Sequence, residues 1–192
     1  MKKFLNPFVY YSGGKTLALG LIGMAAMVWI AGATGQTFRG LISFGIGEPP
    51  WWQLALHLTA GWALFSALLY AAARILSSSH IRLIDIAGNQ ALAKLPNILL
   101  LLSALLYSPQ QILHDADVLE QMSVKELLTY TPPIGMLVSG IIAVAVLVWF
   151  FVWSWKGFAI AANLHDKRAV ISYIGCYALT ELLMAGGMLL LK

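Results

Sequence analysis

The chain has 192 residues, of which 60% are hydrophobic and only 10% are charged, and its formal net charge is +4 at pH 7. A water-soluble domain carries roughly 25% charged residues, so this composition excludes an ordinary soluble protein. We expect one integral membrane domain over residues 1–192, all-α in class, because a chain of this length normally forms a single domain. The single cysteine, Cys176, excludes an internal disulfide.

Five apolar stretches approach the roughly 20 residues that a membrane-spanning helix needs. They cover about residues 16–33, 52–75, 91–107, 134–155 and 170–191. The first stretch also has features of a signal peptide. Its apolar run exceeds the roughly 7–15 residues of a signal core, so we expect a retained helix. The third stretch is the weakest because three unfavourable residues fall in its first two turns: Lys94, Pro96 and Asn97.

Two connecting segments have local structure of their own. The segment "TFRGLISFGIGEPPWW" alternates apolar residues with glycines, and we interpret it as dipping toward the membrane before Pro49 and Pro50. In "SVKELL", Ser123 is followed three residues later by Glu126, which is the pattern of a capping box at the start of a short helix. Both segments are expected on the outer side of the membrane.

The basic residues predict the orientation, because cytoplasmic loops are enriched in Lys and Arg. With the N-terminus inside, nine basic residues lie in inner segments and three in outer ones. The inner set is Lys2, Lys3, Lys15, Arg74, Arg82, Lys94, Lys156, Lys167 and Arg168, and the outer set is Arg39, Lys125 and Lys192. We therefore expect a five-transmembrane-helix bundle in the cell membrane, with a cytoplasmic N-terminus and an outside C-terminus. The scatter of these residues argues against a nucleic-acid partner.

Three stretches together resemble the Yip domain family, the Ypt/Rab-interacting membrane proteins and their short bacterial relatives. They are "NPFVYYSGGKTLALGLI" at the start, "GNQALAKLPNILLLL" before the third span and "WKGFAIAANLHDKRAVISYI" before the last. The resemblance implies a multi-pass protein that is not an enzyme and that acts in membrane organisation or as a binding scaffold. Eukaryotic members carry a long cytosolic N-terminal region, whereas about fifteen residues precede the first span here. This difference argues against small-GTPase binding and favours a bacterial inner membrane.

Glu181 lies near the middle of the last predicted span. A carboxylate at that depth costs about 2.5–3.5 kcal/mol on insertion scales, and such residues are commonly functional. One interpretation is a carboxylate that couples proton or substrate movement; the other is a hydrogen-bonded acid that joins helices. We predict His57, early in the second span, as its partner.

A second polar group precedes the third span. Asp85, Asn89 and Asn97 are spaced by multiples of four, which places them on one face of a helix. Pro96 removes a backbone donor, and the resulting gap is a feature of broken transporter helices. The alternative is an amphipathic helix on the inner membrane surface, with Pro96 in the first turn of the span. Asn163, in the next inner turn, either faces this group or is simply solvated.

Small residues recur every four positions on two spans, and this spacing permits close helix packing. The sets are Ala63, Ala67 and Ala71 in the second span, and Gly135, Ser139 and Ala143 in the fourth. Packing within one chain is the default interpretation, and a homodimer is the alternative.

Motifs of catalysis and of cofactor binding are missing: there is no H-E-x-x-H, no G-x-S-x-G and no phosphate-binding glycine loop. The four histidines fall in different segments, so neither a cofactor nor a metal is expected. Two functions remain. The first is a non-enzymatic scaffold for other membrane proteins. The second is a small transporter or lipid scramblase that uses Glu181 and the stripe of Asp85, Asn89 and Asn97.

Overall fold

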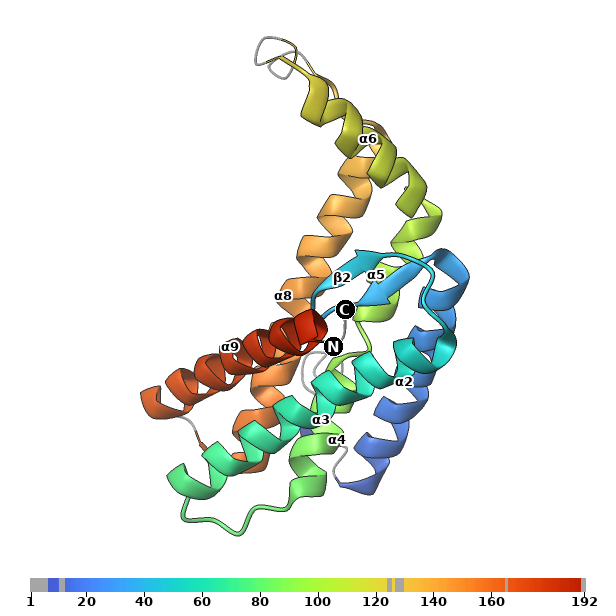
Figure 1. Ribbon diagram of the computed structural model, residues 1–192. Helices are drawn as coiled ribbons and strands as arrows, with labels where there is room; N and C mark the ends of the chain where they lie inside the picture. The colour runs from blue at the N-terminus through green and yellow to red at the C-terminus, as the bar shows by residue number, and fades with distance from the viewer. Residues whose placement is uncertain (1–6, 11–12, 124–125, 127–129, 165, 191–192) are drawn as a thin grey trace.

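The computed structural model describes residues 7–10, 13–123, 126, 130–164 and 166–190, and these form a mostly helical membrane protein (Figure 1). Four helices are long and apolar enough to cross a membrane. They are α2 (Gly14–Thr34), α3 (Trp51–Leu76), α8 (Ile134–Ala162) and α9 (Lys167–Leu190). The helical, membrane-embedded character expected from the composition is thereby confirmed.

The shorter elements fill the connections between these helices. They are η1 (Pro7–Val9), β1 (Gln36–Phe38), β2 (Phe44–Ile46), α4 (Leu83–Ala93), α5 (Asn97–Leu102), η2 (Ser103–Leu105) and α6 (Pro109–Gln121). We call the end of the bundle that holds Gly14, Leu83 and Lys167 the proximal end. The end that holds Thr34, Trp51 and Ile134 is the distal end.

The third predicted span is a broken helix. The helical stretch runs over Leu83–Leu105, beginning well before residue 91, and then bends by 70° into α6. Counting this bent pair as one span raises the number of spans to five, so the fifth span stays a prediction. The break between α4 and α5 follows from Pro96, which has no N–H for Leu92. Tighter three-residue hydrogen bonds replace the helical ones there, from Lys94 N to Ala91 O at 3.2 Å and from Leu95 N to Leu92 O at 3.1 Å.

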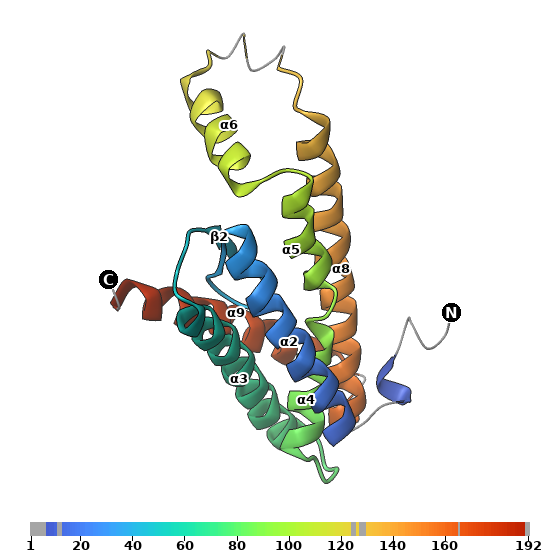
Figure 2. The ribbon, with the colours of Figure 1, turned by 90° about the vertical axis from the view of Figure 1, so that its right-hand side faces the viewer.

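Helix α4 lies at the centre of the bundle, between α2, α3 and α8 (Figure 2). Its residues from Gly88 to Ala93 are all buried, so α4 is not the surface helix of one interpretation above. Helix α2 crosses it closely, because Gly20 presents no side chain: a Cβ there would lie 2.4 Å from the Cβ of Ala91. The Trp62 indole of α3 also donates to the Ala87 carbonyl at 2.9 Å. The central position of α4 therefore depends on small residues in its neighbour.

The segment between α2 and α3 forms a two-stranded antiparallel hairpin, in which Thr37 pairs with Gly45 and Phe38 with Phe44. Its tip, residues 39–43, points into the bundle: Leu41 is 2% exposed and belongs to the same core cluster as Phe65 and Phe158. Gln36 ties the hairpin to α5 by donating to the Leu101 carbonyl at 3.0 Å. The expected dip toward the membrane is thus a hairpin held inside the protein.

At the distal end, α6 and the first half of α8 extend beyond the rest of the bundle and diverge from each other (Figure 2). Residues of α8 in this half are apolar and exposed, with Ile134 80% and Ile141 69% accessible. Exposed apolar helix faces of this kind suit a hydrocarbon surrounding, since lipid rather than water covers them.

The two predicted small-residue faces differ. In α8, Gly135 lies against the Leu106 carbonyl, and the Ser139 hydroxyl approaches the Ser103 carbonyl at 3.4 Å, so this face packs within the chain. The other face points outward from α3, where Ala63, Ala67 and Ala71 are all exposed. Packing within one chain, the default interpretation, is therefore wrong for α3.

Candidate functional site

Glu181 projects from α9 onto the tip of the hairpin. Its Oε1 accepts hydrogen bonds from the backbone N–H of Leu41 at 3.0 Å and of Ile42 at 3.3 Å. The Ser43 hydroxyl reaches its Oε2 at 3.5 Å. Tyr177, one turn earlier in α9, places its hydroxyl within hydrogen-bonding reach of the same carboxylate. The acid is thus surrounded by donors from a segment about 140 residues away in the sequence.

Lys94 approaches the same hairpin tip from the break between α4 and α5. Its side chain is 2% exposed, and its Nζ donates to the Leu41 carbonyl at 3.0 Å. The ring of Phe150 in α8 lies with its centroid 5.9 Å from the same nitrogen, which is within range of a cation–π contact. Lys94 lies midway along Leu83–Leu105, so its charge is at the centre of the protein.

The peptide unit between Leu41 and Ile42 therefore connects the two charges. Its carbonyl, that of Leu41, accepts from the Lys94 ammonium, and its N–H, that of Ile42, donates to the Glu181 carboxylate. Each charge polarises this peptide in the direction that strengthens the other hydrogen bond. An irregular backbone at membrane depth is tolerated only where protein covers it and satisfies its polar groups. We call Lys94, Glu181 and residues 40–43 the charge bridge.

Gly40 is required for this approach. A Cβ at Gly40 would lie 2.0 Å from Oε2 of Glu181, so any side chain would displace the carboxylate from the hairpin. The hairpin tip reaches the acid because this position has no side chain.

Polar side chains of α4 continue from the charge bridge toward the proximal end. The Asn89 amide donates to the Gly157 carbonyl at 2.9 Å, and the Gln90 amide donates to the Ser154 carbonyl at 3.0 Å. The Ser154 hydroxyl donates to Gln90 Oε1 and accepts from the Tyr173 hydroxyl at 2.8 Å. This network joins α4, α8 and α9, and most of the polar side-chain atoms in it are hydrogen-bonded.

Three buried polar atoms have no protein partner among the described residues: Asn89 Oδ1, Asn97 Nδ2 and Ser66 Oγ. Lys94 likewise has three N–H donors and one described acceptor. Buried polar atoms are normally hydrogen-bonded, and ordered water is the usual partner where protein is not. Asn97 and Lys94 lie three residues apart at the helix break, so their free donors belong to one region.

The other predicted residues have different roles. Asp85 forms a two-pronged ion pair with Arg82, at 2.8 and 3.0 Å, at the proximal end of α4. Asn163 ends α8 in a left-handed conformation, φ 51°, and donates to the Ser79 hydroxyl at 3.3 Å. Pro96 precedes α5 at the break. The structure thus brings Asn89, Pro96 and Asn97 together along the central helix and places Asp85 and Asn163 at its end.

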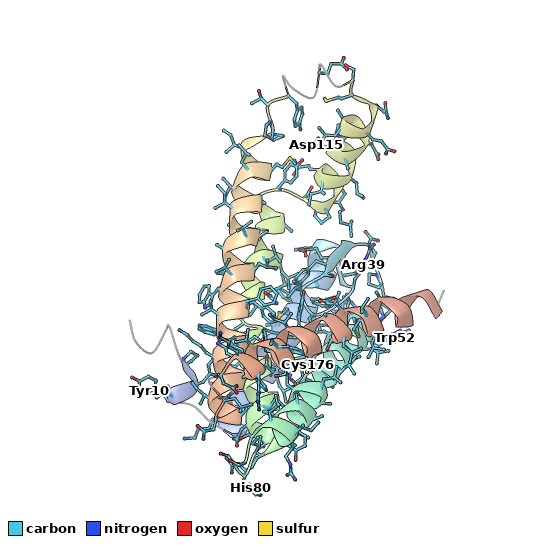
Figure 3. The ribbon with its side chains drawn as sticks, turned by 90° about the vertical axis from the view of Figure 1, so that its left-hand side faces the viewer. Tyr10, Arg39, Trp52, His80, Asp115 and Cys176 are labelled. Carbon is cyan, nitrogen blue, oxygen red and sulfur yellow. The ribbon has the colours of Figure 1, made fainter. Side chains whose placement is uncertain are left out.

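His57, the predicted partner of Glu181, lies on the distal side of the hairpin. It lines a hollow of about 280 Å³ together with Arg39 and Glu48. The ion pairs found among the described residues are Arg82–Asp85 and His114–Asp115, so His57 is not paired with Glu181 there. Figure 3 shows Arg39 above α9 and Trp52, at the start of α3, below it.

Sequence reasoning missed two components of the charge bridge. In the sequence, Lys94 reads as an inner basic residue that weakens the third span. Its position midway along a helical stretch is the signal that could have indicated a buried charge. The hairpin tip carries no charged residue that bonds Glu181, since backbone amides do so, and these have no sequence signature. No group of three or more potential metal ligands occurs among the described residues.

Comparison of the chain with protein-family models, curated proteins and solved structures finds no match.

Proposed function

We propose that this chain is a non-enzymatic multi-pass membrane protein that organises the membrane or serves as a binding scaffold for membrane partners, in the manner of the Yip family that it resembles. The charge bridge supports this proposal. Both charges at membrane depth hold a hairpin in place, with the carboxylate capped by two backbone N–H groups and the ammonium by a backbone carbonyl. A coupling carboxylate would instead need to exchange its partners during transport.

The surface available to a partner is the exposed half of α8 at the distal end. It is a single apolar helix face that extends beyond the bundle, and Leu137, Ile141 and Val144 are 51%, 69% and 65% accessible. Packing of small and apolar side chains drives helix association in lipid, so a transmembrane helix of another protein is the expected partner.

The scaffold proposal is tested by photo-cross-linking in native membranes. A photoreactive residue replacing Ile141 should trap a discrete protein adduct. The same residue replacing Ile171, which is 71% exposed on α9, should give only lipid adducts. Identical products from both positions would remove the support for α8 as a binding surface.

The second function, a small transporter or lipid scramblase, is favoured by one observation. Along the broken central helix, Asn89 Oδ1 and Asn97 Nδ2 are buried and have no protein partner within the part of the chain that the structure describes. Water at these atoms would begin a polar route, and broken helices with free backbone groups form substrate sites in transporters.

Flux into liposomes separates the two functions. The scaffold proposal expects no movement of fluorescent lipid or small ions above protein-free vesicles. Flux that Glu181→Gln abolishes, with the variant still folded and inserted, would replace the scaffold proposal with transport.

A further inference from the structure

Two hollows lie side by side at the distal end, where α5 and η2 turn into α6. Ala104 and Pro109 line both of them, so the hollows share a wall. Their linings differ in chemistry, one being mainly apolar and the other rich in polar groups and backbone. Together they have the two-part character of a site for an amphiphile.

The apolar hollow has a volume of about 440 Å³, within the roughly 300–1,000 Å³ typical of ligand sites. Its apolar lining includes Phe44 and Ile46 of β2, Leu100 of α5, Ile112 of α6, and Met136 and Ala143 of α8. Met136 and Ala143 belong to α8, which is long and apolar enough to cross a membrane, so hydrocarbon is the expected medium around this hollow.

The polar hollow has a volume of about 490 Å³ and lies between the end of α2, the start of α3, η2 and the start of α6. Its lining includes five residues with polar side-chain groups: Thr34, Glu48, Trp51, Ser108 and Gln110. Among the described residues Glu48 forms no ion pair. The six-membered ring of Trp51 packs against Gly32, and about half of the surface of Trp51 is exposed. Tryptophan at this position is typical of the boundary between lipid tails and headgroups.

We propose that the two hollows form one binding site for a membrane phospholipid with a primary ammonium headgroup. One acyl chain lies in the apolar hollow, and the headgroup lies in the polar one, over Ala104 and Pro109. Glu48 and Trp51 line the same hollow, and Glu48 has no ion pair among the described residues. A carboxylate and an indole suit an ammonium group, which they bind by a charge-assisted hydrogen bond and a cation–π contact. The proposal goes beyond the proposed function and does not depend on it.

Helix α6 closes one side of this site. The Tyr107 side chain, which also lines the apolar hollow, donates its hydroxyl to Asp115 one turn beyond Ile112. A capping box between Ser108 and Gln111 fixes the first turn of α6. These two local contacts therefore fix the orientation of the wall that carries Ile112.

The acyl-chain compartment is tested by a lipid-binding measurement. The protein is stripped of lipid in detergent and then mixed with phosphatidylethanolamine. Native mass spectrometry counts the lipids bound to each chain. We expect one tightly held lipid per chain. Ala143→Leu, which fills the hollow, should lower its affinity about tenfold, as overpacking by about 1.4 kcal/mol would. Ala145→Leu is the matched control, because it lies on the same helix outside this hollow.

A second pair of variants covers the case in which Ala143→Leu fails to fold. Ile112→Asp places a charge in the apolar hollow from α6, and Val118→Asp places the same charge on α6 away from it. Only Ile112→Asp should release the lipid. Equal occupancy in both members of either pair, or no tightly held lipid in the unaltered protein, would overturn the proposal.

The headgroup compartment is tested by comparing phosphatidylethanolamine with phosphatidylglycerol and phosphatidylcholine of the same acyl composition. The amine lipid should bind best, and Glu48→Gln should lower its affinity about tenfold, the effect of losing one hydrogen bond to a charged group. Glu120→Gln, an exposed acid on α6, is the control. Equal or tighter binding of phosphatidylglycerol by the unaltered protein would overturn the assignment of the headgroup.

Discussion

Glu181 and Lys94 are charged residues whose placement in a membrane costs free energy, and in this structure both hold the hairpin tip. Each alone at membrane depth would cost about 2.5–3.5 kcal/mol on insertion scales. Joined through the peptide unit between Leu41 and Ile42, they satisfy hydrogen-bonding groups of an irregular segment that lipid could not satisfy. The free energy of the site therefore depends on the hairpin backbone as much as on the two side chains.

Replacing Glu181 should reveal this dependence. Glu181→Ala leaves the N–H groups of Leu41 and Ile42 unpaired and should lower the free energy of unfolding by at least about 2 kcal/mol, at about 1–3 kcal/mol per buried group. Glu181→Gln keeps an acceptor oxygen and should be the milder change. Thermal unfolding of the purified variants in detergent measures the order.

Glu120→Gln, on the exposed surface of α6, should leave the unfolding temperature unchanged. If Glu181→Ala were as stable as the unaltered protein, the hydrogen bonds to the hairpin would contribute nothing to the fold.

Single residues could be predicted only in part. Glu181 is conspicuous because it interrupts an apolar run, and Asn89 and Asn97 because they recur on one helix face. Their partners could not be predicted, since Gly157 and the hairpin tip contribute backbone atoms from segments far away in the sequence. Hydropathy reports the depth of a side chain and carries no information on which backbone it meets.

At the scale of elements, the hairpin and the broken helix were the hardest to predict. The glycine-rich segment before Trp51 indicated a departure from helix, and Pro96 indicated a break. Strand pairing over three residues is too short for a periodic pattern. The central position of α4 depends on the small residues of α2, which a count of apolar residues does not reveal.

The crossing of α2 and α4 provides a test at this scale. Gly20→Ala brings a Cβ to 2.4 Å from Ala91 Cβ and 2.6 Å from its backbone carbon, so the helices must separate. We expect a loss of about 1–3 kcal/mol from overpacking. Gly175→Ala, in open space on α9, should instead stabilise its helix by roughly 0.5–1 kcal/mol. Thermal unfolding of the two variants should therefore shift in opposite directions, and equal shifts would contradict the close crossing.

The contact between Tyr107 and Asp115 of α6 should depend on pH. Burial and the Asp115 carboxylate raise the pKa of Tyr107 to about 12, and the Tyr107 hydroxyl and His114 hold the pKa of Asp115 below its usual range. The tyrosine contribution is fully present below its unfolded pKa, near 10, and is lost as the pH rises through about 12. The aspartate contribution is present above its unfolded pKa, near 3.9, and is lost as the pH falls through the lowered value.

Alkaline absorbance titration measures this effect. Asp115→Asn removes the negative charge and should let one tyrosine ionise at a lower pH than in the unaltered protein. Asp117→Asn, two residues away and exposed, is the control. Superimposable titrations of the unaltered protein and Asp115→Asn would show that the contact does not form.

For the whole molecule, composition and hydropathy were sufficient to predict a helical membrane protein and its four long helices. The number of spans and the orientation stay predictions, because the central helix is short, polar and interrupted at Lys94. A helix that is surrounded by protein need not be apolar, so hydropathy is weakest where burial in protein is greatest. Figure 3 shows His80 and Asp115 at opposite ends of the molecule, which makes the orientation measurable.

Cysteine labelling tests the five-span, N-inside arrangement. In a Cys176→Ala background, Asp117→Cys should react with an impermeant maleimide in intact cells. Ser79→Cys, exposed in the loop before α4, should react only after lysis. Both cysteines reacting from one side would mean that Leu83–Leu105 enters the membrane and returns rather than crossing it.

The hairpin that follows the first helix is secured by a residue of the last one. During synthesis the hairpin and Lys94 leave the ribosome long before Glu181. The hairpin tip therefore has no carboxylate to bind until about 140 later residues have been made. Until α9 inserts, Lys94 lacks a counter-charge and the N–H groups of Leu41 and Ile42 lack their acceptor. Maturation of this protein is therefore completed from its C-terminal end, and a chain that stops before Glu181 should be degraded rather than accumulate.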